Sequence, residues 1–118
     1  MSPTPTVSNT DAQGVQTLAF KMQLKPGVVP EYKRRHDEIW PELAQALREA
    51  GIADYWIFLD VDTLSLFAVL KRKPGGPFEQ LPTLPVMQRW WATMAPLMET
   101  EPDLKPKQWP LPPLFHLP

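Results

Sequence analysis

The first half of the chain contains the stretch Glu31-Tyr-Lys-Arg-Arg-His-Asp-Glu-Ile-Trp-Pro-Glu-Leu43, and its neighbours define a helix around it. Pro30 suits the first position of a helix, where its missing N–H is not needed, and Gly51 is a typical C-terminal stop. A helix is therefore predicted over about 30–50. Because Pro41 lies inside it, we expect a kink or a break just before that residue.

Within this helix Tyr32 and His36 are four residues apart. Positions i and i+4 lie on the same face of an α-helix, with Cβ atoms roughly 5–6 Å apart, so both side chains point into the same space. An imidazole that titrates near neutral pH beside a phenol could act as an acid–base pair. The same spacing also fits simple packing on a half-buried helix.

The segments around the helix have the patterns of strands. Residues 17–25 alternate in polarity, which is typical of a half-buried strand, and place on one face Leu18, Phe20, Met22 and Leu24. Residues 55–60 and 64–71 are two apolar strands joined by the short turn 61–63, which predicts a hairpin.

The second half of the chain is richer in proline. Residues 73–85 form an irregular segment in which Phe78 and Leu81 could anchor a loop or one helical turn, and residues 86–98 have the periodicity of an amphipathic helix. A last short strand is expected around Leu114–Leu117, at an edge of the sheet because prolines flank it.

The predicted order β-α-β-β-α-β defines the fold class as α+β and ferredoxin-like, an antiparallel sheet with both helices on one face. This plan leaves the second face of the sheet uncovered. Because the hairpin strands are apolar on both faces, for example at Trp56 and Ile57, we expect two copies to associate through their sheets as a symmetric homodimer.

The composition excludes several classes of protein. The 118 residues form one domain, and a net charge of −1 gives no field that would attract nucleic acid or an anionic membrane. Cysteine is absent, and no apolar run approaches the about 20 residues of a membrane span. Residues 1–16 lack the apolar core of a signal peptide. We expect them to be a disordered leader before a domain over 17–118, in a cytoplasmic protein.

Trp90 and Trp91 are adjacent on the predicted second helix and so point about 100° apart. One should belong to the core, and the other should line a cleft or an interface. An indole at a cleft wall can pack on the C–H face of a sugar and donate its N–H to a hydroxyl. Packing of both rings in the core and at an interface fits the composition equally well.

The other polar residues that could carry chemistry are expected to have structural roles. Arg89 is expected in a surface ion pair, and the basic run 33–35 on a solvated face, because acidic neighbours cancel its charge. His116 is expected to be structural, and two distant histidines make no metal site. The sequence contains no phosphate-binding loop and no nucleophile motif.

Several segments, taken in order and at matching spacing, resemble the L-rhamnose mutarotase family over about 18–118. They are Tyr32-Lys-Arg-Arg-His36, Ile39-Trp-Pro-Glu-Leu43, Tyr55-x-x-Phe-Leu-Asp60, Leu66-Phe67, Gln88-Arg-Trp-Trp91, Pro102-Asp103 and Phe115-x-Leu-Pro118. The resemblance implies a ferredoxin-like homodimer, a dimeric α/β-barrel type of assembly, that interconverts the α and β anomers of L-rhamnose without a cofactor or a metal.

Carried over by matching position, the family's proton donor falls on His36, with Tyr32 one turn earlier as its catalytic partner. The sugar-binding residues that the resemblance implies are Tyr32, Tyr55, Trp90 and Trp91. The sequence departs from the family pattern at residues 37–38, in the proline-rich segment 73–85, and at His116, where a tyrosine is usual. The competing hypothesis is a ferredoxin-like dimer that acts as a small monooxygenase-like or ligand-binding module.

Overall fold

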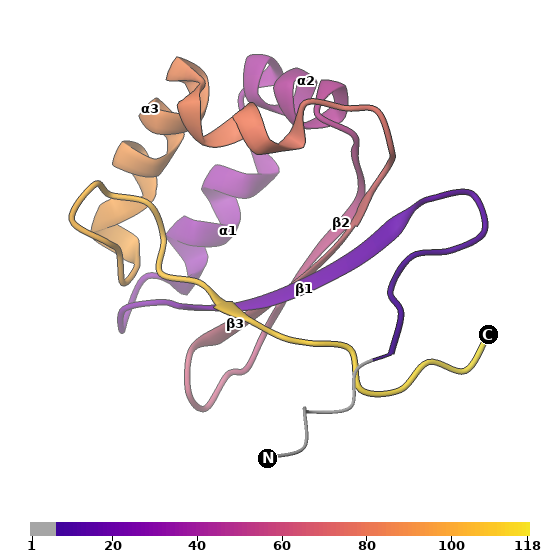
Figure 1. Cartoon of the computed structure of the whole chain (residues 1–118). Helices are drawn as coiled ribbons and strands as arrows, with labels where there is room; N and C mark the ends of the chain where they lie inside the picture. Colours follow the sequence, from indigo (N-terminus) through magenta and orange to yellow (C-terminus); the bar gives the residue numbers. More distant parts are fainter. Residues whose placement is uncertain (1–6) are drawn as a thin grey trace.

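Three α-helices cover one face of a four-stranded sheet in the computed structural model, which describes residues 7–118 (Figure 1). The sheet order β2-β3-β1-β4, with antiparallel pairing throughout, confirms the predicted ferredoxin-like α+β class. The elements follow along the chain as β1 (Gln16–Gln23), α1 (Val29–Asp37), α2 (Pro41–Glu49), β2 (Ile52–Leu59), β3 (Ser65–Arg72), the 3₁₀ helix η1 (Phe78–Thr83), α3 (Pro85–Met94), the 3₁₀ turn η2 (Ala95–Leu97) and β4 (Trp109–Pro110).

The helix predicted over 30–50 is broken in two, as Pro41 led us to expect. Trp40 has the extended backbone angles φ −60° and ψ 131°, which a residue before proline prefers, so α1 ends at Asp37 and α2 begins at Pro41. Helix α2 stops before Gly51, which has φ +97° and thus the left-handed conformation of a helix C-terminus.

The core lies between the helices and the sheet. The four alternating residues predicted to share one face of the first strand all pack in it, and Met22 and Leu24 are buried. Strand β3 adds Leu66, Ala68 and Leu70 from the same side of the sheet. The irregular segment 73–85 contains η1, which anchors in this core through Leu81, with Phe78 packed against it.

Strand β2 begins at Ile52, three residues before the predicted start, and contains a β-bulge. Ala53 pairs with Lys71 and Trp56 with Val69, so β2 uses one more residue than β3 across this interval. Asp54 takes up the extra residue with φ 51°. A bulge changes which residues face each side of the sheet, and here it lets Ile52 and Tyr55 lie on the same side.

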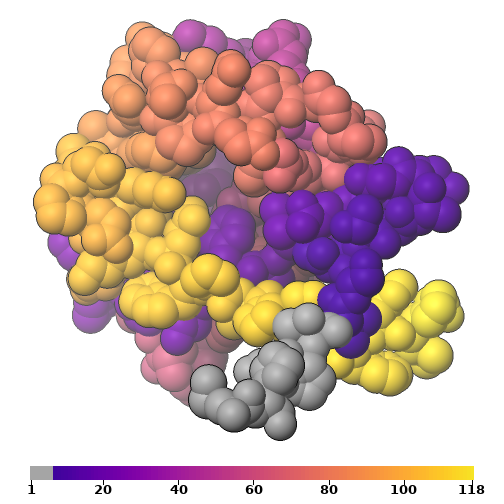
Figure 2. Space-filling view, in the orientation of Figure 1, coloured from indigo at the N-terminus to yellow at the C-terminus, as the bar shows by residue number. Residues whose placement is uncertain are grey.

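The last strand was predicted in the wrong place. The chain pairs with β1 at residues 109–110 rather than at 114–117. The N–H of Leu111 still donates to Ala19 O, but the following prolines, Pro112 and Pro113, have no N–H to continue a ladder. Beyond them Leu114, Phe115 and Leu117 are 73–80% exposed, and the C-terminal segment runs over the surface (Figure 2). The predicted edge position is correct, because β4 ends the sheet.

Part of the predicted leader over residues 1–16 lies outside the described residues, namely 1–6. Residues 7–15 form a turn that folds back onto the start of β1. Asn9 accepts the Thr17 N–H at 2.8 Å through its backbone carbonyl, and Asp11 Oδ1 accepts the N–H groups of Gln13 and Val15 at 2.9 Å. The Val7 N–H donates to Pro113 O, so this turn also contacts the C-terminal segment.

The face of the sheet opposite the helices carries exposed aromatic side chains. Trp56 is 57% exposed and Phe58 is 53% exposed, and their rings stack with centroids 5.8 Å apart. Across the strands these two residues pair with Val69 and Phe67, which are partly buried. The open face is therefore apolar along its centre, as the sequence predicted.

Candidate functional site

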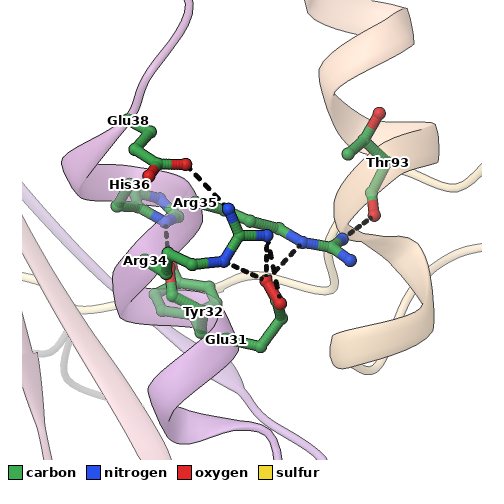
Figure 3. Close-up of polar contacts among 7 residues, drawn as sticks. All are labelled: Glu31, Tyr32, Arg34, Arg35, His36, Glu38 and Thr93. Atoms are coloured by element: carbon green, nitrogen blue, oxygen red, sulfur yellow. Dashed lines mark hydrogen bonds and ion pairs between the residues drawn. The ribbon is translucent and has the colours of Figure 1, made fainter.

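Tyr32 and His36 lie on the same face of α1, as their spacing predicted. Their rings stack with centroids 4.2 Å apart and an interplanar angle of 29° (Figure 3). His36 Nδ1 is 3.1 Å from the backbone carbonyl oxygen of Tyr32. A carbonyl only accepts hydrogen bonds, so Nδ1 carries the proton in the neutral ring, and Nε2 is left with a free lone pair.

The indole of Trp90 packs against the His36 imidazole as well. Its ring meets His36 edge-on at 5.3 Å and Trp40 edge-on at 5.2 Å. Trp90 comes from α3 and Trp40 from the break between α1 and α2. His36 is therefore held between Tyr32 and Trp90, and Trp40 supports Trp90 from the other side. Both contacts of the indole have the edge-to-face geometry that aromatic rings prefer.

His36 and its neighbours Tyr32 and Trp90 border a cavity of about 980 Å³ between the helices and β2. His36, Tyr32, Tyr55 and Trp90 all line it, and the bulge in β2 is the reason that Tyr55 faces the helix side. The other lining residues are mostly apolar, with charged side chains among them: Leu24, Val29, Lys33, Asp37, Ile39, Leu43, Ala44, Leu47, Arg48, Ile52, Ala53, Asp54, Ile57, Leu59, Leu66, Lys73 and Met87.

Burial keeps the two phenols of the cavity neutral. Desolvation raises the pKa of the Tyr32 hydroxyl well above its usual range, and the nearby Tyr55 raises it further. Desolvation also raises the pKa of Tyr55 to about 12. Since 38% of the Tyr55 surface is exposed, water screens this residue more than it screens Tyr32. Both phenols are thus hydrogen-bond donors at neutral pH.

The pKa of the His36 imidazole also shifts in the direction that favours the neutral form. Desolvation lowers the pKa of His36 from 6.5, and the bond to the Tyr32 carbonyl and the charge of Asp37 only partly oppose this shift. At neutral pH His36 is consequently an uncharged base whose Nε2 can accept a proton. An uncharged base between hydroxyl donors suits proton transfer on a polar, uncharged molecule.

The structure separates the two adjacent tryptophans. Trp90 lines the cavity, whereas Trp91 is buried in the core cluster and is not among the lining residues. The site geometry therefore brings together four of the predicted residues, Tyr32, His36, Tyr55 and Trp90, and leaves out Trp91.

The other polar residues considered in the sequence lie away from the cavity or at its rim. Arg89 forms the expected surface ion pair, with Glu42 at 3.1 Å. Lys33 pairs with Asp37 at 2.6 Å, as expected for a solvated face. His116 lies in the exposed C-terminal segment. Among residues 7–118, no three His, Cys, Asp or Glu side chains are grouped to hold a metal ion, and no helix is long and apolar enough to cross a bilayer.

Most of the lining residues had not been singled out as site residues from the sequence, among them Met87, Asp54 and Lys73. Met87 stands one helical turn before Trp90, so the spacing on α3 could have identified it. Asp54 and Lys73 reach the cavity only through the bulge of β2 and the turn after β3. No local pattern encodes that approach.

Aromatic walls, neutral hydroxyl donors and one uncharged base characterise an α+β domain equipped for a small polyhydroxylated ligand. A family model described as L-rhamnose mutarotase matches residues 17–117. The chain belongs to this L-rhamnose mutarotase family.

Individual members of this family are similar to the chain over most of its length. The L-rhamnose mutarotase of Burkholderia ambifaria is 61% identical over 103 residues, which are 87% of this chain and 99% of the relative. That of Acidiphilium cryptum is 56% identical over 104 residues, 88% of this chain and 100% of the relative. The crystal structure of an L-rhamnose mutarotase from Formosa agariphila superposes with a TM-score of 0.80 at 40% identity, covering 87% of this chain and 99% of that one. A conserved protein from Methanosarcina mazei, at 16% identity and a TM-score of 0.56, shares the fold alone.

The lowered pKa of His36 predicts a specific titration. We expect the His36 Cε1 proton to titrate with a midpoint below 6.5 in NMR spectra, because desolvation favours the neutral ring. The unfolded chain then binds this proton more readily than the folded one. The free energy of unfolding should therefore decrease as the pH falls below about 6.5. A His116→Gln variant assigns the two histidine signals, and a His36 midpoint above 6.5 would contradict the prediction.

Proposed function

We propose that this chain interconverts the α and β anomers of L-rhamnose, with His36 as its acid–base group. The observation that carries the proposal is the free Nε2 of His36 in an aromatic-walled cavity, in a chain of the L-rhamnose mutarotase family. The groups placed for proton transfer, the phenol of Tyr32 and the imidazole of His36, are desolvated and uncharged, which supports an uncharged sugar as the substrate.

The reaction needs one proton to move between two oxygens on the same carbon. Neutral His36 accepts the proton of the anomeric hydroxyl at Nε2 while the bond between C1 and the ring oxygen breaks. The imidazolium then donates that proton to the former ring oxygen, which gives the open-chain aldehyde. Rotation about C1–C2 followed by the reverse transfers closes the other anomer. His36 is thus the proton donor of the ring-opening step, after acting first as the base.

The phenols and the indole supply the remaining interactions. Tyr32 and Tyr55 stay protonated and can donate hydrogen bonds to sugar oxygens, including the ring oxygen as it gains negative charge. Trp90 offers an apolar surface for the C–H groups and the 6-methyl of a deoxy sugar. Trp91 would act on the sugar only indirectly, through the core that supports its neighbour.

The proposal is tested by saturation-transfer proton NMR on L-rhamnose at anomeric equilibrium. Irradiating one anomeric proton should reduce the signal of the other when the protein is present, beyond the spontaneous exchange. The substitution His36→Asn should lower this catalysed exchange by roughly 10²–10⁴-fold, the usual contribution of a general acid–base group. His116→Asn is the matched control and should leave the rate unchanged, because His116 is exposed and lies outside the cavity.

Catalysed exchange that survives in a folded His36→Asn variant would refute the assigned role. Absence of exchange with the native chain would refute the activity itself. In that case quenching of tryptophan fluorescence by an aromatic ligand would favour the monooxygenase-like or ligand-binding alternative.

We also propose that the chain forms a homodimer through the open face of its sheet. Trp56 and Phe58 leave a stacked aromatic pair exposed there, which a second sheet would bury. In analytical ultracentrifugation the native chain should therefore sediment as a dimer, and the Phe58→Glu variant should sediment as a monomer. Ala92→Glu, on the exposed side of α3, should leave the dimer intact. A native chain that sediments as a monomer at micromolar concentration would contradict the proposal.

A further inference from the structure

We propose that Arg35 is a positioning residue that ties α1 to the C-terminal end of α3 and thereby holds His36 against Trp90. The inference rests on the proposed function, and it adds to the site a residue that does not contact the cavity. Arg35 precedes His36 in the chain and reaches in another direction, across to the neighbouring helix (Figure 3).

The guanidinium of Arg35 bridges two helices. Its Nη1 donates to the backbone carbonyl oxygen of Thr93 at 2.5 Å, and its Nε lies 3.5 Å from Glu31 Oε1. The Arg35 side chain is only 27% exposed, so this bridge is shielded in part from water. Glu31 lies one turn before Arg35 on α1, and its carboxylate orients the Arg35 guanidinium toward Thr93.

The Thr93 carbonyl is a suitable acceptor for a cation. It belongs to the last turn of α3, where carbonyl groups lack the N–H partners that a continuing helix would supply. The negative end of the helix dipole lies at the same place and favours a positive charge. The Thr93 hydroxyl already donates to Arg89 O at 2.9 Å, so the carbonyl is the group that faces Arg35.

This bridge runs beside the contact that orients the catalytic ring. Arg35 and His36 are consecutive, and Trp90 and Thr93 are one turn apart on α3, so the two contacts join the same two helices. Among residues 7–118, Arg35 makes the only side-chain hydrogen bond between α1 and α3. A hydrogen bond constrains distance and direction more tightly than an aromatic edge contact. The bridge therefore restrains the approach of α1 to α3 beside the contact between His36 and Trp90.

The neighbouring Arg34 provides a matched control. It has the same chemistry, but its partners are Glu31, at 2.8 Å from Nε, and Glu38, at 2.7 Å from Nη1, in and just after α1 itself. Lysine at position 35 would keep the charge. It has a single nitrogen, however, and cannot bond the Thr93 carbonyl and Glu31 in the geometry of the fork.

The test compares Arg35→Met, Arg35→Lys and Arg34→Met in the full chain, by saturation transfer on L-rhamnose and by NMR of the His36 ring protons. Arg35→Met should lower kcat by roughly 10–100-fold, the effect of a misplacement of about 1 Å, with a smaller change in KM. Its His36 ring protons should shift as the Trp90 ring current changes. Arg35→Lys should recover only part of kcat, and Arg34→Met should stay within about twofold of the native chain.

Equal kcat values in the Arg35→Met and Arg34→Met variants would overturn the proposal. If Arg35→Met fails to fold, Arg35→Lys decides, and a native kcat with unshifted His36 protons in that variant would overturn it. If the native chain catalyses no exchange, the proposed function fails. The His36 shifts still test the positioning by Arg35 in that case, because they require no activity.

Discussion

The break at Pro41 is the constraint on which the site depends. A proline cannot continue the helix, and Trp40 before it adopts extended angles, so one helical stretch becomes α1 and α2. Both helices and β2 line the cavity. A single straight helix would not border the cavity in this way. The break also places His36 in the last turn of α1 and puts Trp40 against the indole of Trp90.

Electrostatics divide the surface of α1 into two parts. Arg34 pairs with Glu38 on the outer side, and Lys33 pairs with Asp37 at the rim of the cavity. Such exposed pairs add little stability. On the cavity side, Tyr32 and His36 are desolvated and kept neutral. The helix therefore places uncharged donors and acceptors inside the cavity and charged pairs at its rim and on its outer side, which fits a sugar.

Much of the fold follows from local patterns in the sequence. Alternating polarity gave the first strand, proline and glycine gave the limits of the helices, and the i, i+4 spacing of Tyr32 and His36 placed both on one face. The sequence could not decide which of Trp90 and Trp91 faces the cavity, because adjacent helical residues differ only in direction and the packing of α3 sets that direction. The bulge at Asp54 and the sheet position of residues 109–110 depend on pairing with distant strands, so no local pattern reveals them.

A crystal structure of the His36→Asn variant with L-rhamnose tests the role of His36 most directly, since this variant should bind the sugar and turn it over slowly. The sugar should lie in the cavity, with its anomeric carbon beside residue 36, its oxygens within hydrogen-bonding distance of Tyr32 or Tyr55, and its methyl group against Trp90. A sugar bound elsewhere, or one whose anomeric carbon points away from residue 36, would contradict the assignment of His36 as the acid–base group.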